Sequence, residues 1–209
     1  MGISVGVDIG QQADPTAIVM VDTYRPEPTA PKEWPDVRHC VRWIERVPLG
    51  TLYGAVVERV AVVAEAAQTW GSTMIVLDAT GVGRPVWDML RARTGVAIRA
   101  VVFTAAEAET QPEYNVHRVP NRDLVTSVEV VLQRRCLEVV PDCPLQADLN
   151  AELAAFDFSI SARTGHDRYE AAAGSHDDLV MALGLALWWA ERPSPVDAWV
   201  EACRRRVAR

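Results

Sequence analysis

Four aspartates stand where a hydrophobic segment of the chain ends or begins. Asp8 and Asp78 each close a short apolar segment, whereas Asp177 and Asp178 open a long one with apolar residues at three- and four-residue steps. Carboxylates that converge in space repel one another, so a cluster of them is unfavourable unless cations lie among them. We therefore predict that Asp8, Asp78, Asp177 and Asp178 are catalytic residues and metal ligands of one site.

Carboxylate oxygens are the ligands that hard divalent cations prefer, so Mg²⁺ or Mn²⁺ are the expected occupants. In a site with two ions ~3.5–4 Å apart, one activates a water as nucleophile and the other stabilises the leaving oxygen of a phosphoryl displacement. This is the chemistry of phosphodiester hydrolysis. Each aspartate alone has a simpler interpretation, because Asp8 precedes a turn and an acidic pair suits the first turn of a helix. Only the set of positions indicates a metal site.

The first half of the chain predicts three antiparallel strands, then a helix and a strand buried on both faces. Turn residues separate these segments, and the Pro-rich stretch 25–36 is expected to be a surface loop. The predicted elements of this half are strands at 3–8, 16–23, 37–47 and 73–78, and a helix at 52–70.

The second half alternates helices with strands. Residues 104–117 are acidic and are expected to be irregular, and residues 156–172 are expected to form a β-hairpin with its turn at Thr164 and Gly165. The predicted elements of this half are helices at 84–93, from about 119, at 144–156 and from about His176, and strands at 96–103 and 136–140.

This order of elements suits an α/β fold of the ribonuclease H type. Its mixed central sheet has three antiparallel strands and then parallel strands, is flanked by helices, and here gains an extra β-hairpin before the C-terminal helix. The ends of the first and fourth strands lie side by side in such a sheet, so Asp8 and Asp78 become neighbours. The 209 residues fit a single domain, 1–209, with a basic tail at 194–209.

The composition excludes several classes of protein. No apolar segment approaches the ~18 residues of a membrane span, and the N-terminus lacks the basic start of a secretory signal. A cytoplasmic protein without membrane contact is therefore expected. The four cysteines lack zinc-site spacing, and the chain has no P-loop motif. The net charge of −7 is unfavourable for binding nucleic acid, yet all basic residues except Lys32 are arginine, the side chain best suited to phosphate.

The sequence resembles the nuclease domain of the large terminase subunit of tailed phages, a member of the ribonuclease H and resolvase-like superfamily. The matching motifs follow the family's order over nearly the whole chain, and His-Asp-Asp-Leu is the most specific of them. They are Val5-Gly-Val-Asp8-Ile-Gly with Asp14-Pro-Thr-Ala, Ile75-Val-Leu-Asp78-Ala-Thr-Gly-Val-Gly83, Val119-Pro-x-x-Asp-Leu, Leu149-Asn-Ala-Glu-Leu-Ala-Ala-Phe156 and Gly174-Ser-His-Asp-Asp-Leu-Val-Met-Ala-Leu.

The resemblance implies two-metal cleavage of double-stranded DNA during phage genome packaging, with Asp8, Asp78, Asp177 and Asp178 as ligands. It also implies a packaging ATPase domain, a portal and a small terminase subunit as partners, in the cytoplasm of a host cell. The family's packaging ATPase is absent from this chain, so we expect an excised domain or a stand-alone relative. Many relatives have a lysine where Asn121 stands.

Six basic residues around the predicted site are candidates for contacts to DNA phosphates. Arginine makes bidentate contacts to phosphate, although each of these residues also fits an ordinary surface position. They are Arg84, Arg118, Arg122, Arg163, His166 and Arg168.

Three other functions remain open. A Holliday-junction resolvase shares the fold and the carboxylates. A fragment of an actin-like or sugar-kinase-type ATPase would explain the glycines that follow Asp8 and Asp78, although such enzymes need two such domains and do not use an aspartate pair that opens the last helix. A non-catalytic packaging module that docks on the portal or the small subunit is the third.

Overall fold

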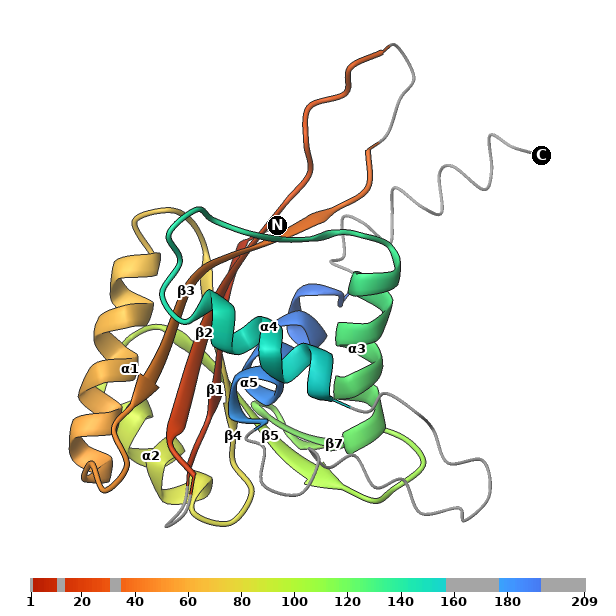
Figure 1. The fold of residues 1–209 in the computed structure, drawn as a ribbon. Helices are drawn as coiled ribbons and strands as arrows, with labels where there is room; N and C mark the ends of the chain where they lie inside the picture. The colour runs from red at the N-terminus through yellow and green to blue at the C-terminus, as the bar shows by residue number, and fades with distance from the viewer. Residues whose placement is uncertain (1, 11–13, 31–34, 157–176, 193–209) are drawn as a thin grey trace.

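The computed structural model describes residues 2–10, 14–30, 35–156 and 177–192. They form one eight-stranded mixed sheet with helices on both faces (Figure 1), in the strand order β6-β7-β5-β4-β1-β2-β3-β8. The strands are β1 (Gly2–Asp8), β2 (Thr16–Tyr24), β3 (Arg38–Val47), β4 (Thr73–Asp78), β5 (Ala97–Thr104), β6 (Thr110–Glu113), β7 (Val116–Pro120) and β8 (Leu137–Val139).

Within the described segments, two helices cover one face of the sheet and three cover the other (Figure 1). The first face carries α1 (Tyr53–Ala67) and α2 (Gly83–Arg93), and the second carries α3 (Asn121–Gln133), α4 (Gln146–Ala155) and α5 (Asp178–Ala190). Each face has its own buried apolar core, because the central strands are apolar on both sides. No helix in the described segments is long and apolar enough to cross a membrane.

The strand directions bring the ends of distant segments to one edge of the sheet. β1 pairs antiparallel with β2 and parallel with β4, and β5 and β7 continue in parallel beyond β4. Parallel strands end on the same side, so β1, β4, β5 and β7 all finish at what we call the carboxyl edge. Asp8 and Asp78 are the last residues of their strands, which are paired up to Val7 and Leu77.

The predicted architecture is confirmed, with two differences. Residues 104–117 are not irregular as expected: they include β6 and the start of β7. The signal was weak because β6 is a four-residue edge strand with every residue exposed. Its pairing with β7, which itself pairs with β5, stabilises a strand that the local sequence does not indicate. α5 begins at Asp178 rather than near His176, and the predicted hairpin at 156–172 lies outside the described residues apart from Phe156.

Helix α5 lies very close to β1. A Cβ atom at Gly6 would stand 1.9 Å from the carbonyl oxygen of Ala182 and 2.9 Å from the backbone nitrogen of Ala186. Glycine and alanine therefore let the helix backbone rest almost directly on the strand. Because Gly6 is two residues before Asp8, this contact brings the start of α5 to the carboxyl edge.

We predict that Gly6→Ala lowers the unfolding free energy by at least about 2 kcal/mol, because the new methyl group forces α5 away from the sheet. Chemical denaturation followed by circular dichroism measures the change. Gly71→Ala is the control, since a Cβ there meets nothing within 4 Å. Equal stability of the two variants would contradict the close approach.

Candidate active site

The turn after β4 fixes Asp78 at the carboxyl edge. Its side chain is only 8% exposed, and its Oδ1 accepts a hydrogen bond from the Thr80 backbone nitrogen at 2.8 Å. The Thr80 hydroxyl in turn accepts from the backbone nitrogen of Phe103 at 3.0 Å, which ties the turn to β5. Only glycine fits at position 83, because a Cβ there would stand 1.9 Å from the Asp78 carbonyl oxygen. Helix α2 thus starts directly against Asp78.

Asp8 lies on the neighbouring strand, and Asp177 lies just before α5. The carbonyl oxygen of Asp177 accepts the first hydrogen bond of the helix, from the backbone nitrogen of Met181 at 2.8 Å. Both aspartate side chains are partly exposed. Three separate elements, β1, β4 and the start of α5, therefore present carboxylates to the same edge.

The electrostatics of Asp8 reflect this convergence. Burial raises the pKa of Asp8 well above its usual range, and the negative charges of Asp78, Asp177, Asp178 and Asp14 raise it further, in that order. Burial also raises the pKa of Asp78, to about 6, against the lowering effect of its bonds to Thr80. The folded chain therefore keeps its negative charges at this edge at an energetic cost.

The carboxylates at this edge do not form a complete metal-binding site in the described residues. Among the described residues, no three His, Cys, Asp or Glu side chains are close enough to hold a metal ion as they stand. The donor set nevertheless fits a divalent cation. The charges of Asp78, Asp177 and Asp178 reach Asp8 and raise its pKa, and carboxylate oxygens are the groups that such a cation prefers.

Asp178 is placed differently from the other aspartates. Its side chain is buried, with 2% of the residue exposed, and both of its oxygens accept hydrogen bonds from Arg46. Arg46 also contacts Glu152 of α4. Neither Arg46 nor Glu152 was predicted from the sequence to have a role. A signal for Glu152 was available, since it lies three residues after Leu149 and four before Phe156, on the apolar side of a helix.

The described arginines of the predicted DNA contacts lie near the carboxyl edge. Arg84 is in the first turn of α2, Arg122 is in the first turn of α3, and Arg118 is exposed on β7 two residues before its end. Arg84 lies 3.5 Å from Glu113 and stacks over Trp87, and Arg122 bonds to the carbonyl oxygen of Glu107.

The other predicted contacts, Arg163, His166 and Arg168, lie outside the described residues. Asn121 is the first residue of α3 and thus also lies at the carboxyl edge.

A cleft of about 500 Å³ opens just beyond the end of β1. It lies between the turn after β1 and the start of α1, and Gly10, Asp14, Thr16 and Tyr53 are among its lining residues. The Gly10 backbone nitrogen donates to the Thr16 hydroxyl at 3.1 Å, which closes this turn. The cleft gives the carboxyl edge a recess open to solvent.

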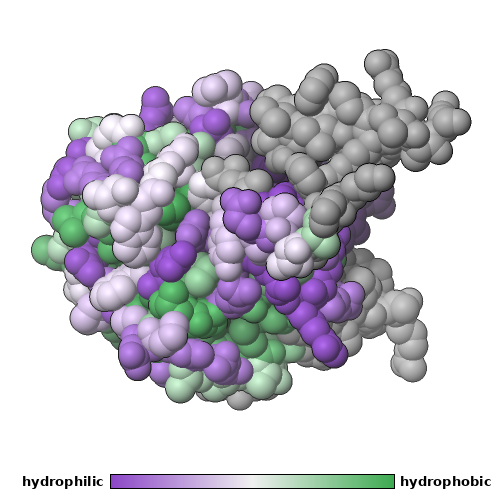
Figure 2. Space-filling view, turned by 90° about the horizontal axis from the view of Figure 1, so that it is seen from above, coloured by the Kyte–Doolittle hydropathy of each residue, from purple (hydrophilic) through white to green (hydrophobic). Residues whose placement is uncertain are grey.

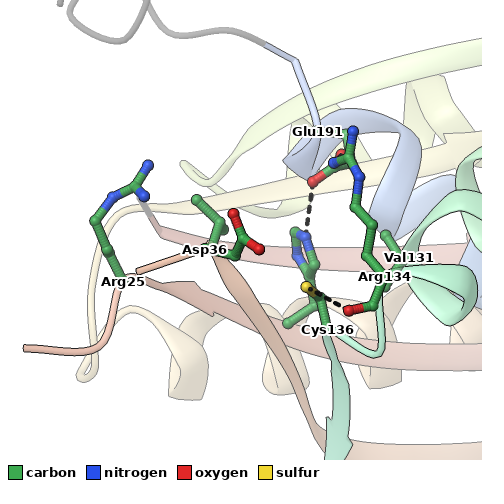
Figure 3. A pocket seen from close by; sticks show the side chains of 8 residues that line it. Arg25, Asp36, Val131, Arg134, Cys136 and Glu191 are labelled. Atoms are coloured by element: carbon green, nitrogen blue, oxygen red, sulfur yellow. Dashed lines mark hydrogen bonds and ion pairs between the residues drawn. The ribbon is translucent and has the colours of Figure 1, made fainter. Parts of the chain in front are cut away.

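A second pocket, of about 280 Å³, lies at the opposite edge of the sheet (Figure 3). Its buried His39 has Nδ1 3.1 Å from the Thr23 hydroxyl and Nε2 2.8 Å from Glu191 Oε1. Arg134 bonds to the other oxygen of Glu191 at 3.1 Å. Viewed from above, from the side of this edge, the described surface is mixed, with hydrophilic side chains around a hydrophobic area (Figure 2). This pocket lies at the far end of α5 from Asp177.

We predict that the unfolding free energy of the metal-free chain falls as pH rises from 4 to 6. Folded Asp78 keeps its proton up to about pH 6, whereas the unfolded side chain loses it near its usual value of 3.8, so the folded state binds more protons in this window. Asp78→Asn should remove up to about 3 kcal/mol of this decrease.

Denaturation in EDTA between pH 4 and 8 measures the effect, with the exposed Asp88→Asn as control. If the two variants have the same pH profile, Asp78 does not carry the shifted pKa.

Comparisons with known proteins find similar structures but no similar sequence. No protein-family profile matches the sequence, and a search of curated proteins finds no match. The structure is similar to that of the large terminase nuclease from the thermophilic phage G20c, with a TM-score of 0.58 at 18% identity over 88% of this chain and 80% of that chain.

Two further similar structures come from different viruses. The Mn-soaked human cytomegalovirus terminase nuclease domain gives a TM-score of 0.52 at 13% identity, over 93% of this chain and 85% of that one. The g2p large terminase nuclease domain of bacteriophage SPP1 with bound Mn gives 0.50 at 13% identity, over 89% and 85%. At such identities the likeness establishes the fold, which is that of terminase nuclease domains, and confirms the resemblance at the level of structure.

Proposed function

We propose that this chain is a metal-dependent endonuclease that cleaves double-stranded DNA, acting as the nuclease of a phage genome-packaging terminase. The main support is the convergence of three carboxylates at one sheet edge, where Asp78 and Asp177 raise the pKa of Asp8. The fold shared with phage and cytomegalovirus terminase nuclease domains supports the same function, and two of those structures were soaked with or contain Mn.

In this proposal Asp8, Asp78 and Asp177 hold Mg²⁺ or Mn²⁺, with two ions expected. The ions would supply an activated water and a charge that stabilises the leaving oxygen. The protein supplies the orientation: Thr80 fixes Asp78, and the packing of α5 on β1 brings Asp177 to Asp8. A cation among these carboxylates replaces repulsion by attraction, and we expect it to draw them closer together.

The arginines around the carboxyl edge would bind the DNA backbone. Arg84 and Arg122 begin helices on opposite faces of the sheet, so a duplex laid across the edge can meet both of them. Each is more than a third exposed and can exchange its present partner for a phosphate. Arg118 is a further contact in this proposal, as are Arg163, His166 and Arg168.

The proposed setting follows from the same function. A terminase nuclease works with a packaging ATPase domain, a portal and a small terminase subunit, and a phage-encoded enzyme of this kind acts in the cytoplasm of the host. We propose these as partners and location of this chain.

We predict that the purified chain nicks and linearises plasmid DNA with Mg²⁺ or Mn²⁺ and stops on chelation. Asp8→Asn, Asp78→Asn and Asp177→Asn should each lower the rate by roughly a thousandfold, about 4 kcal/mol of transition-state stabilisation, and leave the far-ultraviolet circular dichroism unchanged. Asp88→Asn, which alters an exposed carboxylate on α2, should keep full activity. Full activity in Asp78→Asn would rule out the proposed ligand set.

The same assay separates this function from that of a junction resolvase. Equal protein should cut linear duplex and a four-way junction with the same flanking sequence at similar rates. A strong preference for the junction would favour a resolvase, and no cleavage of either would favour a non-catalytic packaging module.

We predict that Arg84→Gln and Arg122→Gln each weaken duplex binding and lower the slope of log affinity against log salt by about one. Fluorescence anisotropy between 50 and 300 mM salt, in Ca²⁺ to suppress cleavage, measures the slope. Arg134→Gln is the matched control, because Arg134 is exposed at the opposite edge of the sheet. An unchanged slope in all three variants would place the DNA elsewhere.

A further inference from the structure

An arginine-centred cluster lies beside the three proposed ligands, on the α5 side of the sheet. Arg46 of β3 donates from Nε to Asp178 Oδ2 at 2.8 Å and from Nη2 to Oδ1 at 3.1 Å. Its Nη2 also contacts Glu152 Oε1, and its Nη1 lies 3.6 Å from Asp148 Oδ1. Asp178 and Glu152 are buried, whereas Asp148 is half exposed at the rim. A single guanidinium thus joins β3, α4 and α5.

Glu152 connects this cluster to the backbone of α5. Its Oε2 accepts hydrogen bonds from the backbone nitrogens of Leu179 at 3.0 Å and Val180 at 3.2 Å. These are two of the N–H groups that a helix leaves without partners in its first turn. A side chain of α4 therefore caps α5, and Arg46 holds that side chain in place.

The strand register sets Arg46 in the same row as Asp8. Asp8 pairs with Ala17 of β2, and Ala17 pairs with Arg46 of β3. Residues directly opposite in antiparallel strands point to the same face, and each strand adds about 4.8 Å, so the backbones of Asp8 and Arg46 lie about 10 Å apart. The small side chain of Ala17 leaves room above the row for the first turn of α5.

The first turn of α5 spans this row. Asp178 is buried and binds Arg46 at one end of the row, whereas Asp177, the preceding residue, is partly exposed. The charges of both raise the pKa of Asp8 at the other end, and that of Asp177 does so more strongly. Both oxygens of Asp178 are committed to the guanidinium, and releasing one partner of a buried ion pair leaves the other charge uncompensated. The two adjacent aspartates therefore have different surroundings, because Asp178 is buried against Arg46 and Asp177 is partly exposed.

We infer that Arg46, Glu152 and Asp178 form an anchor that positions Asp177 opposite Asp8, so that Asp178 is a positioning residue and not a metal ligand. The inference rests on the proposed function, because it concerns the metal site of that function. It divides the aspartate pair into one ligand, Asp177, and one structural partner of Arg46. The sequence alone assigned both to the metal.

Stability without metal distinguishes the two roles at a fixed pH of 8. Neutralising a ligand carboxylate relieves repulsion, so Asp8→Asn and Asp177→Asn should raise the denaturation midpoint in EDTA. Neutralising an anchor carboxylate breaks an ion pair, so Asp178→Asn should lower it, as should Arg46→Gln. The double variant should lose little more than either single variant, because both remove the same interaction.

Binding of Mn²⁺ tests positioning separately from stability. Titration followed by the electron paramagnetic resonance of free Mn²⁺, at a temperature where every variant is folded, should show that Asp177→Asn abolishes tight binding. Arg46→Gln and Asp178→Asn should weaken it by about 10- to 100-fold, as for groups that orient ligands. Arg42→Gln is the matched control, because Arg42 of the same strand makes a two-bond contact with Asp22 and should leave Mn²⁺ affinity unchanged.

Two results would overturn the inference. If Asp178→Asn stabilises the metal-free chain and abolishes Mn²⁺ binding, as Asp177→Asn should, Asp178 is a ligand. If Arg46→Gln lowers stability but leaves Mn²⁺ affinity unchanged, the cluster only stabilises the fold. A wild-type chain that binds Mn²⁺ without cutting DNA contradicts the proposed function and leaves this comparison intact, whereas a wild-type chain that binds no Mn²⁺ overturns both.

Discussion

The close packing of α5 on β1 is the contact on which the rest of the site depends. Gly6 allows the backbone of α5 to lie against the strand, at a distance that no side chain would permit. This contact fixes the height of the helix above the sheet, and the ion pair of Asp178 with Arg46 fixes its start. Together the two contacts hold the start of α5, and with it Asp177, at the end of the sheet that carries Asp8 and Asp78.

The aspartates at the carboxyl edge destabilise the folded state. Buried Asp78 and the half-buried Asp8 both have raised pKa values, because water is partly excluded and negative charges are gathered there. Elsewhere the structure pairs its acidic groups, as in the contacts of Glu45 with Arg59 and of Asp22 with Arg42. A fold that pairs such carboxylates with arginine but gathers several aspartates at one edge is suited to receive positive charge from outside the chain.

The sequence predicted the sheet and the meeting of Asp8 with Asp78, because alternation and apolar runs encode strands and strand order encodes their neighbours. It missed β6, whose four exposed residues carry no pattern, and the start of β7. It also could not divide roles between Asp177 and Asp178. That division depends on Arg46, 131 residues earlier than Asp177, and distant pairing of this kind leaves no local signal.

Helix α5 is fastened to one strand at both of its ends. Arg46, next to the last residue of β3, holds Asp178, and His39, next to its first residue, meets Glu191 just beyond the helix. Strand β3 and helix α5 are therefore connected at both ends, so that sliding α5 along its axis would disturb both polar contacts at once. A movement of α5 that widened the carboxyl edge would therefore have to break the contacts of Arg46 and His39 together.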